Sequence, residues 1–104
     1  MAAEGNGQKR EYHVDFAAIV AQQIKSAAER AKELGRLQQV IDALKVIERR
    51  LRTDPLSFGE FTNEPPGNLI YHTGTIFPLS VIFAIDRANA VVYIRKVVLS
   101  SASE

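Results

Sequence analysis

Four side chains in the final third of the sequence are of types that can move protons or hold phosphate: His72, Tyr93, Arg95 and Lys96. An imidazole titrates near neutrality and can act as a general acid or base. A tyrosine beside an arginine on an open sheet face can stack a base and hold a phosphate. We take these four as candidate catalytic residues. The alternative is structural, with a hydrogen-bonded histidine and strand cations that extend their stems to reach solvent.

A basic cluster lies about halfway along the chain, at Lys45, Arg49, Arg50 and Arg52. Lys45, Arg49 and Arg52 are spaced to share one face of a helix, from which they could contact a nucleic-acid backbone. Cations near a helix C-terminus also complement the helix dipole, and that role alone would account for them. The cluster is our candidate nucleic-acid-binding site.

Three phenylalanines, Phe58, Phe61 and Phe77, lie in or beside a segment dense in glycine, proline and asparagine. Exposed aromatic side chains can form an apolar patch for a partner protein. Filling of the core is the alternative. We therefore take Phe58, Phe61 and Phe77 as candidate partner-binding residues.

Composition excludes several other kinds of site. The net charge of +1 argues against a global electrostatic grip on nucleic acid. Without cysteine, and with two histidines far apart in sequence, no metal site is expected. The sequence has no phosphate loop, dinucleotide fingerprint or nucleophile elbow, so no cofactor is expected. It also lacks the roughly 18 consecutive apolar residues of a membrane span. We expect a soluble, cytoplasmic protein with no membrane partner.

The first half of the chain has helical spacing. Apolar residues recur at three- and four-residue steps over 16–34 and again over 37–51. Asp15 is placed to cap the first helix, and Gly35 separates the two. A short strand over 12–14 would precede them. The pattern predicts a tight helical hairpin.

The second half has the composition of strands. Apolar runs over 78–86 and 91–99 flank a short polar turn, which predicts a hairpin, and 69–72 is a further short strand. The fold class is therefore α+β, with a two-helix hairpin packed on a small antiparallel sheet. This domain spans 12–99, between a flexible N-terminal tail over 1–11 and a C-terminal tail over 100–104.

Strand alternation gives the faces of the last strand. Side chains two residues apart on a strand share a face. Tyr93 and Arg95 are thus expected on one face of the sheet, and Ile94 and Lys96 on the other.

The element order, together with Leu51-Arg52-Thr53-Asp54-Pro55 leading to Gly59, resembles the RelE/ParE superfamily of small bacterial toxins. The closing apolar runs over 81–86 and 91–94 resemble it too. The resemblance covers about residues 12 to 99 and implies the α+β fold of that family. Its ribonuclease members cut messenger RNA on the ribosome without a metal, using basic and tyrosine side chains on the sheet.

This sequence departs from the ribonuclease pattern at two places. Ser80 stands where those members have an arginine before the apolar run, and Ser100 and Ser101 follow the last strand where basic or aromatic residues are usual. Ribosome-dependent endonuclease activity is therefore disfavoured. The resemblance implies a toxin-like component of a type II toxin–antitoxin system that acts through protein partners.

The expected partners follow from the same resemblance, and one rival function does not depend on it. We expect an antitoxin-like protein or self-association, with RNA on the ribosome or gyrase as other targets. The alternative function is a non-catalytic, dimeric protein-interaction module unrelated to toxicity.

Overall fold

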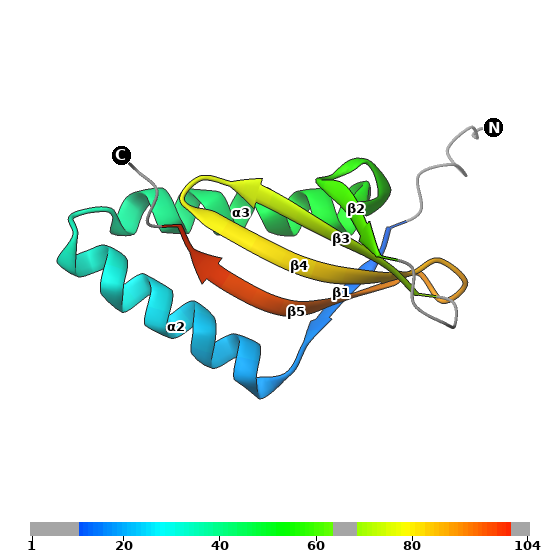
Figure 1. The fold of residues 1–104 in the computed structure, drawn as a ribbon, viewed down its shortest axis with the longest axis horizontal. Coiled ribbons are helices and arrows are strands. Elements are labelled where there is room, and N and C mark those ends of the chain that lie inside the picture. Colours follow the sequence, from blue (N-terminus) through cyan, green and yellow to red (C-terminus); the bar gives the residue numbers. More distant parts are fainter. Residues whose placement is uncertain (1–10, 64–68, 101–104) are drawn as a thin grey trace.

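A computed structural model describes residues 11–63 and 69–100 (Figure 1). Most of both expected tails, and the stretch 64–68 of the turn-rich segment, lie outside these residues. The elements are, in chain order, β1 (His13–Phe16), α2 (Ala18–Glu33), α3 (Leu37–Thr53), a short 3-10 helix (Pro55–Ser57), β2 (Glu60–Asn63), β3 (Leu69–Ile76), β4 (Leu79–Asp86) and β5 (Val91–Leu99).

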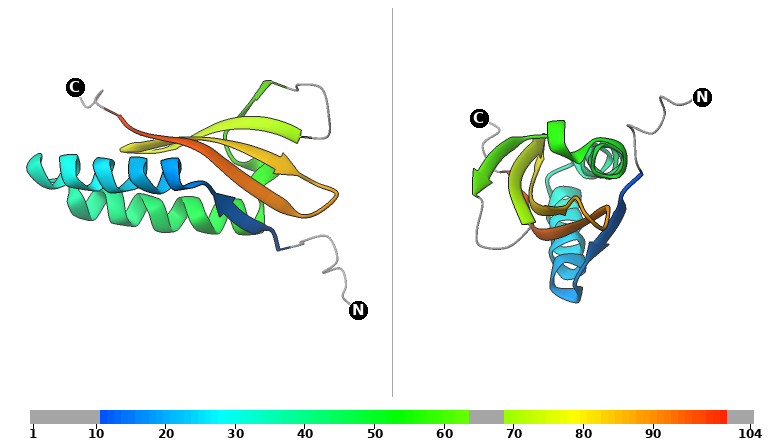
Figure 2. Two further views of the ribbon diagram at one scale, coloured as in Figure 1. Left: turned by 90° about the horizontal axis from the view of Figure 1, so that it is seen from below. Right: turned by 90° about the vertical axis from the view of Figure 1, so that its right-hand side faces the viewer.

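The molecule has two layers. The strands form one sheet in the order β1-β5-β4-β3-β2, and both helices lie on the same face of it (Figure 2). The predicted fold class, a two-helix hairpin on a small sheet, is confirmed. One feature differs, because β1 runs parallel to β5 while every other pair is antiparallel. The sheet is therefore mixed.

The helical hairpin closes at Gly35, as the sequence predicts. Gly35 has φ of 74°, in the left-handed region that glycine adopts without steric cost. The turn is held by the Arg36 N–H, which donates to the Ala31 carbonyl at 2.7 Å. At the far end, α3 stops at Thr53, just before Pro55.

The start of the first helix is two residues later than the helical spacing indicates. Phe16 belongs to β1, where it pairs with Ile94 of β5. Asp15 is not the helix cap: Ala17 occupies that position and makes no side-chain capping bond. The Asp15 carboxylate instead accepts a hydrogen bond from the Phe16 N–H at 2.8 Å. Strand pairing thus overrides a periodicity that would extend the helix.

β2 is an element that the sequence does not predict. It pairs with β3 through an irregular register around Phe61, and it adds an edge to the sheet. β3 extends to Ile76, well beyond the expected short strand, and pairs with β4 along its whole length.

A bulge in β5 changes which side chains share a face. Ile82 pairs with Lys96 and Phe83 with Ile94, so Arg95 is the extra residue. Tyr93 and Lys96 consequently lie on the same face of the sheet. The expectation that Ile94 and Lys96 share a face is wrong, because the bulge interrupts the strict alternation.

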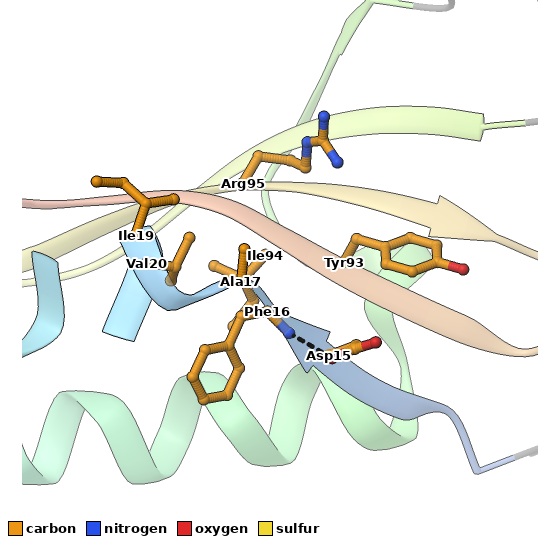
Figure 3. Close-up of a pocket in the computed structure, with 8 residues that line it drawn as sticks. All are labelled: Asp15, Phe16, Ala17, Ile19, Val20, Tyr93, Ile94 and Arg95. Atoms are coloured by element: carbon orange, nitrogen blue, oxygen red, sulfur yellow. Dashed lines mark hydrogen bonds between the residues drawn. The ribbon is translucent and has the colours of Figure 1, made fainter. Parts of the chain in front are cut away.

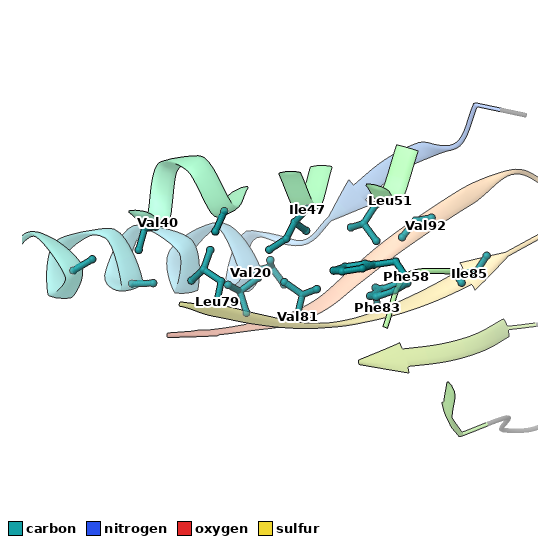
Figure 4. Packing of buried hydrophobic residues seen from close by; sticks show 14 residues of the cluster. Val20, Val40, Ile47, Leu51, Phe58, Leu79, Val81, Phe83, Ile85 and Val92 are labelled. Atoms are coloured by element: carbon teal, nitrogen blue, oxygen red, sulfur yellow. The ribbon is translucent and has the colours of Figure 1, made fainter. Parts of the chain in front are cut away.

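The core fills the space between the helices and the sheet (Figure 4). Its largest fully buried side chains include Leu51 of α3 and Phe83 and Leu79 of β4. Phe58, after the 3-10 helix, stacks on Phe83 with ring centroids 5.6 Å apart. Only 3% of Phe58 is exposed, so its expected place in a partner-binding surface is wrong. Stacking in the core explains its burial.

Candidate functional site

The resemblance implies chemistry on side chains of the sheet, and the helices leave one face of the sheet, the face opposite to them, uncovered. Three cross-strand rows of side chains from β3, β4 and β5 form the centre of this open face. In order along the sheet they are Tyr71–Ala84–Tyr93, Thr73–Ile82–Lys96 and Thr75–Ser80–Val98.

The first row holds two tyrosines on either side of an alanine. Ala84 is 0% exposed although it lies on the open face, because the larger Tyr71 and Tyr93 stand beside it on the neighbouring strands. Both tyrosines are partly exposed. The row therefore presents two aromatic side chains, one on each side of a covered alanine, and carries no charge.

The other two rows carry little charge. Lys96 is exposed and is the cation that these three rows contain. The Ser80 hydroxyl shares a hydrogen bond with the Thr75 hydroxyl at 2.9 Å. At the position where the resemblance would place an arginine, the open face thus offers a neutral hydroxyl pair.

Tyr93 and Arg95 come together in a shallow pocket of about 400 Å³ where β1, α2 and β5 meet (Figure 3). Figure 3 shows both side chains extending from β5, while Phe16 points toward α3. Asp15 also lines this pocket, because parallel pairing puts it beside Tyr93. Sequence reasoning missed Asp15 as a pocket residue, since nothing local to β1 reveals its partner strand.

His72 is not part of this arrangement. It is buried on the helix side of the sheet, where its ring packs against Phe61 and Phe83. Its Nδ1 lies 3.0 Å from the Phe58 carbonyl oxygen. A carbonyl accepts only, so Nδ1 carries the hydrogen and donates it. The histidine links β3 to the segment after the 3-10 helix.

The basic cluster divides in two. Lys45, Arg49 and Arg52 are exposed on α3, on the helix side of the molecule, as their spacing predicts. Arg52 pairs with Glu48 at 2.5 Å. Arg50 turns away and lies over the Phe58 ring, 4.9 Å from its centroid. Arg50 therefore contacts an aromatic residue of the core and is not part of the exposed face that the other three cations form.

The remaining phenylalanines do not form one patch. Phe61 is 57% exposed on β2, and Phe77 is half-exposed in the β3–β4 turn, where the Arg36 guanidinium lies over its ring. Phe61 pairs with His72, five residues before Phe77, which corresponds to about 16 Å along a strand. Each is an isolated apolar spot.

Two further findings bound the chemistry. Within 11–63 and 69–100, no three metal-ligating side chains lie close enough together to hold an ion. In the same residues, no helix is long and apolar enough to cross a membrane.

One carboxylate has a shifted pKa. Asn89 donates two hydrogen bonds to the Asp86 carboxylate, one from its side-chain amide and one from its backbone N–H, and these bonds lower the pKa of Asp86 from its ordinary value. Both residues lie at the β4–β5 turn, so the shift stabilises the turn.

Comparison with known proteins identifies the fold. No family model and no curated protein matches the sequence. Two of the solved structures that match cover almost the whole chain. The first is the RelBE2 toxin–antitoxin complex from Mycobacterium tuberculosis, with a TM-score of 0.65 and 14% identity, covering 88% of this chain and 94% of that chain. The second is the archaeal RelE–RelB complex from Pyrococcus horikoshii OT3, with a TM-score of 0.56 and 16% identity, covering 89% of this chain and 99% of that chain.

This chain has a RelE-like fold. The resemblance that the sequence suggests is confirmed at the level of the fold. Within the RelE-like fold, the two helices pack on one sheet face and leave the three rows of β3, β4 and β5 uncovered.

Proposed function

We propose that this protein is the toxin-like component of a type II toxin–antitoxin system, that it acts through protein partners, and that it lacks the usual ribonuclease residues. The observation that carries the proposal is the combination of a RelE-like fold with an open face on which Ser80 bonds to Thr75. An arginine there would stabilise developing phosphate charge, and stabilisation of that kind is usually a large catalytic term.

The comparisons support the partner. One similar structure is the RelBE2 toxin–antitoxin complex, and the other is an archaeal RelE–RelB complex. The two tyrosines and Ile82 on the open face favour a protein contact over a polyanion, because aromatic side chains are enriched at protein interfaces. We infer an antitoxin-like protein, with gyrase as a target that would need no nuclease residues.

Induced expression in a bacterial host tests the toxin. We expect growth to stop on induction and to recover when a small protein from the neighbouring reading frame is co-expressed. Mapping of messenger RNA ends in the arrested cells should show no ribosome-dependent cleavage. Unimpaired growth would contradict the toxin and favour the dimeric interaction module, which a sedimentation measurement of the purified protein would then test.

Cleavage of messenger RNA at the ribosome would contradict the absence of nuclease activity. The variants Arg95→Ala and Lys96→Ala would then show whether these cations have taken over the missing role. Lys32→Ala, which removes an exposed cation of α2 away from the three rows, is the matched control.

A further inference from the structure

The pocket where β1, α2 and β5 meet holds two opposite charges that do not neutralise each other. Asp15 and Arg95 both line it, together with Tyr93 (Figure 3). Within residues 11–63 and 69–100, neither Asp15 nor Arg95 forms an ion pair, with the other or with any further group. The pocket therefore presents a carboxylate and a guanidinium that remain available to a ligand.

A β-bulge sets the position of the cation. Arg95 is the extra residue of β5, between Ile94 and Lys96. A bulge interrupts the alternation of side chains along a strand and re-aims one of them, and bulges are over-represented next to active sites. At this bulge Arg95 joins Tyr93 at the pocket, while Lys96 lies on the open face. The irregularity in β5 thus supplies the pocket with its positive charge.

The end of β1 brings the carboxylate to the same place. β1 pairs with β5 as far as Phe16 and Ile94, and the chain then leaves the sheet to begin α2. Asp15 is the partner of Tyr93 on the neighbouring strand, which lies about 4.8 Å away. Arg95 follows Tyr93 by two positions, or about 7 Å along the strand. The three polar residues therefore lie within the span of one small molecule.

Apolar side chains complete the pocket. Its lining includes Phe16, Ile19, Val20 and Ile94. Ile19 is 62% exposed, so it presents apolar surface that a ligand would cover. The pocket measures about 400 Å³. Because a cavity of about 150 Å³ is enough for benzene and ligand pockets begin at about 300 Å³, a benzene-sized group fits here beside two charged groups.

We propose that this pocket binds a small zwitterion with an apolar group, the chemistry of a free α-amino acid that has a large apolar side chain. The Arg95 guanidinium binds the carboxylate of the ligand, and the Asp15 carboxylate binds its ammonium group. The apolar lining covers the side chain of the ligand. This inference goes beyond the proposed function, and neither depends on the other.

The mixed charge of the pocket argues against a polyanion. From the sequence, Tyr93 and Arg95 could stack a base and hold a phosphate. Asp15 places a negative charge beside both of them, and a phosphate would be repelled by it. A ligand with a single charge would leave the opposite group of the pocket without a partner. A zwitterion matches both groups.

The probe is L-phenylalanine, together with three analogues that each lack one of its features. Phenylpropanoate lacks the ammonium group, phenylalanine amide lacks the carboxylate, and glycine lacks the apolar group. Each compound is titrated into the isotope-labelled full chain and followed by NMR. We expect saturable shifts of the Ile94 and Arg95 amides with L-phenylalanine, and no shift at Ser80, which lies outside the pocket. Each analogue should bind at least about tenfold more weakly, because it loses one contact of the zwitterion.

Matched variants assign each charge of the ligand to one residue. Arg95→Gln should weaken L-phenylalanine about tenfold and leave the binding of phenylalanine amide, which has no carboxylate, unchanged. Asp15→Asn keeps an acceptor for the Phe16 N–H, and it should weaken L-phenylalanine about tenfold without changing phenylpropanoate. The controls are Lys96→Gln on the open face and Glu33→Gln at the end of α2, both exposed, which should bind as the unaltered chain does.

Three results would overturn the inference. They are the absence of saturable binding of L-phenylalanine, equal binding of L-phenylalanine and an analogue with a single charge, and equal affinities of the pocket variants and their controls. The titrations use the chain without a protein partner and do not depend on the growth assay. Ligand binding without growth arrest would reject the toxin alone, and growth arrest without ligand binding would reject the zwitterion site alone.

Discussion

Gly74 shows how one missing side chain sets the geometry of the core. A Cβ at this position would lie 2.6 Å from two ring carbons of Phe58, closer than real Cβ atoms approach. The glycine therefore lets the Phe58 ring rest on β3 while it stacks on Phe83. His72 lies two residues before Gly74 on the same face of β3. Its ring donates to the Phe58 carbonyl and so holds the same segment in place.

We predict that Gly74→Ala lowers the free energy of unfolding by about 1–3 kcal/mol, the usual cost of overpacking a core. Urea denaturation measures this change in the free energy of unfolding. The control is the same change in a Phe58→Leu background, where the clashing ring carbons are absent. The cost of Gly74→Ala should fall there, because contacting residues do not contribute additively. Equal costs in both backgrounds would show that the ring contact is not the cause.

At this scale the sequence identifies residues by type but not by position. Tyr93, Arg95 and Lys96 can be selected because few other strand residues carry such groups. Their distribution over the two faces depends on the bulge at Arg95, which leaves no mark in the local pattern. His72 and Phe58 are buried because β3 contacts a segment that is distant in the sequence. The residues next to either one in the sequence therefore do not predict its burial.

Among the elements, α2 has a second task besides covering the core. β1 stops pairing at Phe16, so β5 beyond Ile94 has an edge without a neighbouring strand. The Gln23 side chain of α2 reaches this edge, where its Oε1 accepts a hydrogen bond from the Val97 N–H at 2.9 Å. Covering a strand edge with a helix prevents pairing with another chain.

We predict that Gln23→Leu costs about 1–3 kcal/mol in unfolding free energy, because it leaves a largely buried amide without its acceptor. Gln23→Glu keeps an acceptor oxygen at the same reach and should cost less. Amide hydrogen exchange by NMR reports directly on the bond: the Val97 amide should exchange faster in the leucine variant. Unchanged exchange at Val97 would show that the hydrogen bond is not made in solution.

A helix or strand could be predicted from the sequence where its pattern lies within one continuous stretch of residues. Helical periods and the apolar runs of β4 and β5 each reside in one stretch of sequence, and these elements were found. The direction of β1 was not predicted, because a strand this short has the same sequence pattern whether its partner runs parallel or antiparallel. β2 consists of four residues between turn formers, too few to show an alternation.

At the scale of the whole molecule, two backbone hydrogen bonds join the first and last described segments to other elements. The Tyr12 N–H donates to the Arg52 carbonyl at 2.7 Å, and the Ser100 N–H donates to the Pro78 carbonyl at 2.6 Å. Each bond joins an end of the domain to another element.

We predict that a variant consisting of residues 11–100 unfolds within about 2 °C of the full chain, since a change of 1 kcal/mol would shift the midpoint of a domain this size by roughly 4–8 °C. Differential scanning calorimetry makes the comparison. A second variant that starts at residue 14 is the control, because it removes Tyr12 with its hydrogen bond to Arg52 and His13, the first residue of β1, and should melt at a clearly lower temperature. A large drop for residues 11–100 would mean that the expected tails contribute to stability.

The parallel pairing of β1 with β5 has a consequence for synthesis of the protein. His13 finds its partner in Val91, across almost the entire described chain, so a ribosome must make nearly all of the protein before β1 can dock. Until then, α2 and α3 expose the apolar faces that the sheet will cover. Contacts of such long sequence separation slow folding and prolong the lifetime of exposed apolar surface. During that interval the apolar faces of α2 and α3 are open to any protein that binds them.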